Sequence, residues 1–82
     1  MTKINTRALG LSFGVLWGFA ILFIGLLATF FNLGTGFVEI FSDFYFGYNA
    51  SLIGSFVGCF WGFIDGFVGG IIIAWLYNKF SK

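Results

Sequence analysis

The chain has 82 residues, of which 60% are hydrophobic, 24% are aromatic and 9% are charged. Soluble domains carry about 25% charged residues, so this composition excludes a water-soluble globular protein and indicates lipid as the solvent. The chain has one cysteine and no histidine, which excludes a disulfide scaffold, a structural zinc site, a histidine-ligated haem and Ser-His or Cys-His catalysis. We therefore expect no cofactor, no metal and no nucleic-acid partner.

The first apolar run lies between Arg7 and Glu39 and contains no charged residue. It exceeds the about 20 residues that a helix needs to cross about 30 Å of hydrocarbon, and it predicts a spanning helix over about residues 9–33. A second run, about residues 52–77, is also long enough and contains one charge, Asp65. The sequence thus predicts an all-α fold, an integral membrane helical hairpin in a single domain of residues 1–82.

Residues 34–51 connect the two predicted spans. Glycines within residues 34–36 predict the end of the first helix, and Ser51 predicts the N-cap of the second. One face of a short helix is indicated by apolar residues at i, i+3, i+4 and i+7, namely Phe37, Ile40, Phe41 and Phe44. We expect this helix to lie in the outer interface, with Tyr45 and Tyr48 at headgroup level. An irregular aromatic-rich loop is the alternative.

The charged residues are unevenly placed along the chain. All basic residues lie near its two ends: Lys3, Arg7, Lys79 and Lys82. The acids Glu39 and Asp43 lie in the connection. Because basic residues beside a span are retained on the cytoplasmic side, we expect a multi-pass protein of the cytoplasmic (inner) membrane with both termini in the cytoplasm.

Glycine recurs every four residues in both predicted spans. The set comprises Gly10, Gly14 and Gly18 in the first span, and Gly54, Gly58, Gly62, Gly66 and Gly70, with the neighbouring Gly69, in the second. Small residues at i and i+4 let helices in lipid approach closely, so this glycine ladder predicts a packing surface. The ladder either joins copies into a homo-oligomer, which five consecutive glycines favour, or docks the two spans of one hairpin.

The two spans resemble each other at a shift of 44 residues. This shift aligns Gly10, Gly14 and Gly25 with Gly54, Gly58 and Gly69, and it aligns two Trp-Gly-Phe triplets, which begin at Trp17 and Trp61. Because the spans run in opposite directions, it predicts an inverted repeat about a pseudo-two-fold axis in the membrane plane. Duplicated packing chemistry without common ancestry is the alternative. Ile21 aligns with Asp65, and we expect the two tryptophans to form an aromatic seam that fills space beside the glycines.

Asp65 lies near the middle of the second span, where a carboxyl group costs about 2.5–3.5 kcal/mol on insertion scales. Neither span contains a Lys or Arg. The helical wheel places Asp65 in the packed seam, where we expect a neutral acid that donates one hydrogen bond. The candidate acceptors are glycine-flanking carbonyls, the hydroxyls of Ser12, Thr29 and Ser55, and Asp65 of a neighbouring copy. The acid is either an ion or proton site or a group that fixes helix register, and without a second titratable group we expect no enzyme.

The motif W-G-F-I-D-G-F-V-G-G at residues 61–70 and the motif A-W-L-Y-N-K at residues 74–79 resemble those of short two-span prokaryotic membrane proteins labelled bacteriophage holin-like. The resemblance covers almost the whole chain and implies oligomerisation in the inner membrane. The leading interpretation is a small oligomeric pore- or permeation-type protein of the lipid bilayer. The alternative is a structural or accessory subunit of a larger membrane complex.

Thiol labelling tests the predicted orientation. In a Cys59→Ala background, we expect Ser42→Cys to react with an impermeant thiol reagent added outside the cell. Ser81→Cys should react only when the reagent reaches the cytoplasmic side, because the basic ends are retained there. External labelling of position 81 would contradict the orientation.

Overall fold

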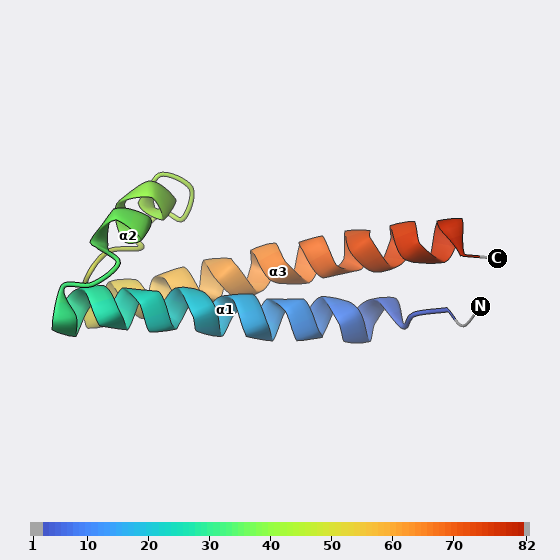
Figure 1. Ribbon diagram of the computed structural model, residues 1–82, viewed down its shortest axis with the longest axis horizontal. Helices are drawn as coiled ribbons and strands as arrows, with labels where there is room; N and C mark the ends of the chain where they lie inside the picture. The colour runs from blue at the N-terminus through green and yellow to red at the C-terminus, as the bar shows by residue number, and fades with distance from the viewer. Residues whose placement is uncertain (1–2, 82) are drawn as a thin grey trace.

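The computed structural model describes residues 3–81 and contains three α-helices: α1 (Thr6–Phe31), α2 (Thr35–Ser42) and α3 (Leu52–Phe80). Helices α1 and α3 form an antiparallel hairpin with both termini at one end, and α2 lies beside the other end (Figure 1). Both long helices are long and apolar enough to cross a membrane. The prediction of an all-helical hairpin with a short helix in its connection is confirmed.

Polar side chains and left-handed residues define where the helices begin and end. The Ser51 hydroxyl accepts a hydrogen bond from the Gly54 N–H at 2.9 Å, which confirms the predicted N-cap of α3. Helix α1 ends before Asn32, whose φ of 58° is left-handed, and its stop therefore precedes the predicted glycines. Gly34, with a φ of 76°, is instead the residue from which α2 begins.

Close backbone contact between α1 and α3 occurs at glycines. A methyl group placed on Gly66 would lie 2.5 Å from the Phe13 carbonyl oxygen, and one placed on Gly70 would lie 2.8 Å from the Gly10 Cα. Real side chains do not tolerate such distances, so the absence of a Cβ is what permits the approach. We call this contact the glycine seam; it comprises Gly10, Gly14 and Gly18 of α1 and Gly62, Gly66 and Gly70 of α3.

The other two glycines of the α3 ladder face the connection instead of α1. The nearest side chain to Gly54 belongs to Asn49, and Tyr48 lies directly over Gly58. The ladder thus has two neighbours within one chain, and its length does not require a second copy. Self-association through the ladder stays a prediction.

The register of the glycine seam agrees with the 44-residue repeat. A methyl group on Gly66 would lie 3.0 Å from the Gly14 Cα, and one on Gly62 would lie 3.2 Å from the Gly18 Cα. Gly18 and Gly62 are themselves 44 residues apart, so each contacts its own counterpart in the repeat. A two-fold axis through this contact would exchange α1 and α3, as the inverted repeat predicts.

Asn78 links the segment before α1 to the last turn of α3, at the end of the hairpin where the termini lie. Its side-chain amide donates to the Ile4 carbonyl oxygen at 2.9 Å and accepts from the Ile4 N–H at 2.8 Å. The Lys3 ammonium group also donates to the Asn78 carbonyl oxygen at 2.7 Å. These bonds hold the segment before α1 against the last turn of α3. Lys82 lies outside the described residues.

The connection folds back against the hairpin. Tyr45 and Tyr48 are only 6% and 1% exposed and pack with Ile21 in the core cluster, while their place at headgroup level stays a prediction. The inward face of α2 also differs from the predicted stripe, since Ile40 and Phe44 are exposed. Phe37 and Phe41 of the predicted stripe pack against the core, together with Val38, which lies outside that stripe. The predicted face is therefore correct in part.

Substitution of one glycine in the seam and one outside it tests the seam. We expect Gly66→Leu to destabilise the hairpin by about 1–3 kcal/mol, because the new side chain would collide with the α1 backbone. Gly69→Leu should have little effect, since a Cβ there meets nothing within 4 Å. Thermal unfolding in detergent, followed by tryptophan fluorescence, compares the two. Equal losses of stability would show that the glycine seam does not hold α1 against α3.

Candidate functional site

A chain of two hydrogen bonds joins the three parts of the fold at Asp65. The Trp17 Nε1–H donates to the Tyr45 hydroxyl oxygen at 2.9 Å, and the Tyr45 hydroxyl donates to the Asp65 Oδ2 at 2.6 Å. An indole nitrogen can only donate, so the phenol oxygen accepts there and its own proton is available for the carboxyl group. Asp65 Oδ2 therefore accepts this bond, and the neutral acid that donates a hydrogen bond stays a prediction.

Asp65 lies beside the glycine seam, not inside it. It is the fourteenth residue of the 29-residue α3 and is exposed. The neighbouring Gly66 faces the Phe13 backbone, and one residue along a helix turns the next side chain by about 100° away from that contact. The helical-wheel prediction therefore placed the carboxyl group too far inward.

The hydroxyls predicted to bind Asp65 serve their own helices instead. Ser12 donates to the Ala8 carbonyl oxygen at 2.8 Å, and Thr29 donates to that of Gly25 at 2.7 Å. Ser55 bonds in the same way, to the carbonyl oxygen four residues earlier at 2.7 Å. Each hydroxyl proton is thus used within one helical turn, and none of the three hydroxyls bonds to Asp65.

A short turn after α2 positions Tyr45. The Tyr45 N–H donates to the Phe41 carbonyl oxygen at 2.7 Å, and the Tyr48 N–H donates to the Tyr45 carbonyl oxygen at 3.0 Å. The Tyr45 ring also lies nearly parallel to the Trp61 ring, with centroids 6.5 Å apart and an interplanar angle of 10°. The turn and the aromatic contact together direct the phenol towards the middle of α3.

The two tryptophans of the repeat both bind the connection. Trp61 Nε1–H donates to the Phe46 carbonyl oxygen at 2.8 Å, while Trp17 binds Tyr45. Since Tyr45 and Phe46 are consecutive, both indoles project to one side of the hairpin. Sequence analysis expected Trp17 and Trp61 only to fill space in an aromatic seam. Their N–H groups also donate hydrogen bonds to polar atoms of the turn.

Tyr48 packs over Ile21, the residue of α1 that corresponds to Asp65 in the repeat. Its hydroxyl donates to the carbonyl oxygen of Ile21, the counterpart of Asp65, at 2.8 Å. Burial raises the pKa of Tyr48 to about 12, and burial together with the bond to Asp65 raises that of Tyr45 to about 12. Both phenols therefore stay protonated donors at neutral pH. The stability they contribute is complete below about pH 10 and is lost as the pH rises through about 12.

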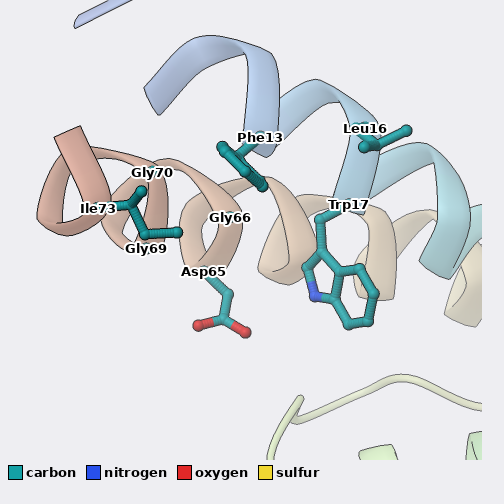
Figure 2. Close-up of a pocket in the computed structure, with 8 residues that line it drawn as sticks. All are labelled: Phe13, Leu16, Trp17, Asp65, Gly66, Gly69, Gly70 and Ile73. Atoms are coloured by element: carbon teal, nitrogen blue, oxygen red, sulfur yellow. The ribbon is translucent and has the colours of Figure 1, made fainter. Parts of the chain in front are cut away.

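Asp65 borders two open grooves. One has a volume of about 360 Å³ and is lined by Phe13, Leu16, Trp17, Asp65, Gly66, Gly69, Gly70 and Ile73. Asp65 and Trp17 project to the same side of this groove from α3 and α1 (Figure 2). The other, about 380 Å³, lies between α3 and the aromatic residues of the connection. Among residues 3–81, no group binds the second carboxyl oxygen, Oδ1.

Sequence analysis did not assign Tyr45 and Tyr48 to the site. One signal was present, because two of the three tyrosines lie in the connection and neither span offers Asp65 a basic partner. A mid-span acid without an intra-span donor needs one from elsewhere in the chain or from another chain. The depth to which the connection folds back is not encoded in any local pattern.

No protein-family model, curated protein or solved structure matches this chain. A functional proposal therefore depends on the geometry around Asp65.

Removal of one hydroxyl tests the hydrogen-bond chain. We expect Tyr45→Phe to destabilise the docked connection by about 1–2 kcal/mol, because Trp17 loses its acceptor and Asp65 its donor. Hydrogen exchange of the amides at residues 43–48 should accelerate by about 5–30-fold. The matched control, Tyr77→Phe, removes a hydroxyl from an exposed residue of α3 and should leave that exchange unchanged. Unchanged exchange in Tyr45→Phe would contradict the assigned bonds.

Proposed function

We propose that the protein is a small integral membrane protein that acts as an accessory subunit of a larger membrane complex. In this proposal α1 and α3 cross the inner membrane, and the face that carries Asp65 binds another membrane-spanning segment. The length and apolar character of both helices support the insertion. Lys3, Arg7 and Lys79 lie at the end where the termini meet, which supports cytoplasmic termini.

The exposed carboxyl group at the middle of α3 is the observation that carries this proposal. Intramembrane acids face protein or water and pair with other groups, because hydrocarbon cannot solvate them. Tyr45 binds one oxygen of Asp65, no group among residues 3–81 binds Oδ1, and the residue lines both grooves. A hairpin alone in lipid would leave that oxygen without a partner. A second membrane-spanning chain on this face would supply one.

The glycine seam supports the same conclusion. Its closest contacts are made within the hairpin, so they are not available to a second copy without opening α1 from α3. The free surface beside the seam is instead the groove lined by Asp65 and Gly69. A Cβ built on Gly69 would meet no atom within 4 Å. Assembly through that groove would leave the hairpin intact.

A permeation function in a homo-oligomer, of the holin-like type, is the second candidate. The observation that favours it is that Asp65 opens to grooves on both sides, so a ring of copies would carry one acid per subunit at a common depth. Apart from Asp65, both grooves are lined mostly by apolar residues and glycines, which offer few polar groups to a wet pathway. This is why we place the accessory function first.

Affinity purification in a mild detergent tests the accessory function. We expect the wild-type chain to recover another membrane protein in fixed ratio, and Asp65→Leu to lower that recovery about tenfold, because it leaves the partner's polar group unpaired. Asp43→Asn is the matched control, since it removes an exposed acid from the connection. A homogeneous homo-oligomer without any other protein would contradict the accessory function. Proton or ion leak in vesicles containing that oligomer would favour permeation.

A further inference from the structure

We propose that the groove beside Asp65 receives a lysine or arginine side chain from the middle of a partner's membrane-spanning helix. This inference rests on the proposed accessory function and names the chemistry of the partner. Asp65 lines the groove, and no group among residues 3–81 binds its Oδ1. An acid at this depth is stabilised most directly by an opposite charge.

The lining of the groove suits a long basic side chain. Its walls are apolar and include the aromatic rings of Phe13 and Trp17, while Asp65 supplies the only carboxyl group. Lysine and arginine bury their methylene stems along apolar surface and place their charge at a polar group. An aromatic ring near that charge adds a favourable cation–π contact. Trp17 and Asp65 project together at one edge of the groove, so both would lie near the cation (Figure 2).

A second copy of the chain cannot supply this cation. No Lys or Arg occurs between Arg7 and Lys79, so the basic residues of a parallel or antiparallel copy lie near the ends of its helices. A neighbouring Asp65 would instead bring two carboxyl groups together, which disfavours the charged form of both. Charge complementarity therefore assigns the groove to a different chain.

The pseudo-two-fold repeat indicates that this half of the hairpin is incomplete. Gly25 and Gly69 are counterparts in the repeat. A Cβ on Gly25 would meet the Ser55 hydroxyl at 2.5 Å and the Tyr48 ring at 3.1 Å, whereas a Cβ on Gly69 meets nothing within 4 Å. The chain thus covers one half of the symmetric surface with its own tyrosine. The half with Asp65 is left for the partner.

Synthetic membrane-spanning peptides test the partner chemistry directly. The full chain, labelled with a donor dye at Phe80→Cys in a Cys59→Ala background, is reconstituted in lipid vesicles with acceptor-labelled leucine-rich peptides. The peptides carry Arg, Leu or Glu at their central position and are otherwise identical. We expect energy transfer to show about tenfold stronger association with the Arg peptide than with the Leu peptide, and none above background with the Glu peptide.

Three variants assign the preference to this groove. Asp65→Asn should abolish the preference for Arg by removing the charge, and Gly69→Leu should abolish it by filling the groove. Gly36→Leu is the control, because a Cβ on Gly36 also meets nothing within 4 Å but lies on α2. It should preserve the preference. Equal association of the Arg and Leu peptides with the wild-type chain, or a preference that survives Asp65→Asn, would overturn the proposal.

The outcomes also separate this inference from the proposed function. If an Asp65-dependent partner co-purifies but the Arg peptide is not preferred, the accessory function stands and the partner chemistry is wrong. If the Arg peptide is preferred but no partner depends on Asp65, the site stands and the accessory function is wrong.

Discussion

The close contact between the backbones of α1 and α3 at their glycines is the feature on which the rest of this structure depends. With a Cβ at Gly66 or Gly70 the two helices could not approach to the observed distance. In this register Gly18 meets Gly62, its counterpart in the repeat, and a two-fold axis through that contact would exchange α1 and α3. If α1 and α3 cross a membrane as proposed, such close packing is expected to stabilise the hairpin, because helices in lipid gain little from hydrophobic burial against each other.

The register has a direct chemical consequence. It brings Trp17 and Trp61 to one side of the hairpin, where both donate hydrogen bonds to the turn after α2. Tyr48, after this turn, binds the Ile21 carbonyl oxygen. Tyr45 binds only one oxygen of Asp65, the counterpart of Ile21. An approximately symmetric scaffold thus acquires one covered half and one open half. Asp65, the acid in the middle of α3, lies in the open half. The proposed partner site is based on that difference between the two halves.

Much of the fold could be predicted from the sequence because apolar length, capping residues and glycine spacing are local patterns. Ser51 as a cap and the short helix in the connection are of this kind. The partner of Asp65 could not be predicted, because Tyr45 is 20 residues away and its position depends on how the turn packs. The predicted face of α2 was right at Phe37 and Phe41 and wrong at Ile40 and Phe44, because apolar spacing shows which residues share a face but not which of them contact the rest of the fold. The α1 stop was placed too late because Asn32 adopts the left-handed conformation usually expected of glycine.

The account depends most on the bond between the connection and the middle of α3, and solid-state NMR in lipid bilayers measures it directly. A sample carrying ¹³C at the tyrosine ring carbons and at the aspartate carboxyl carbons should show a cross-peak between Tyr45 and Asp65, since the hydroxyl and carboxyl oxygens lie 2.6 Å apart. The cross-peak should disappear in Tyr45→Phe. Well-ordered signals from both residues without a cross-peak would show that the connection does not reach Asp65, and would contradict the account.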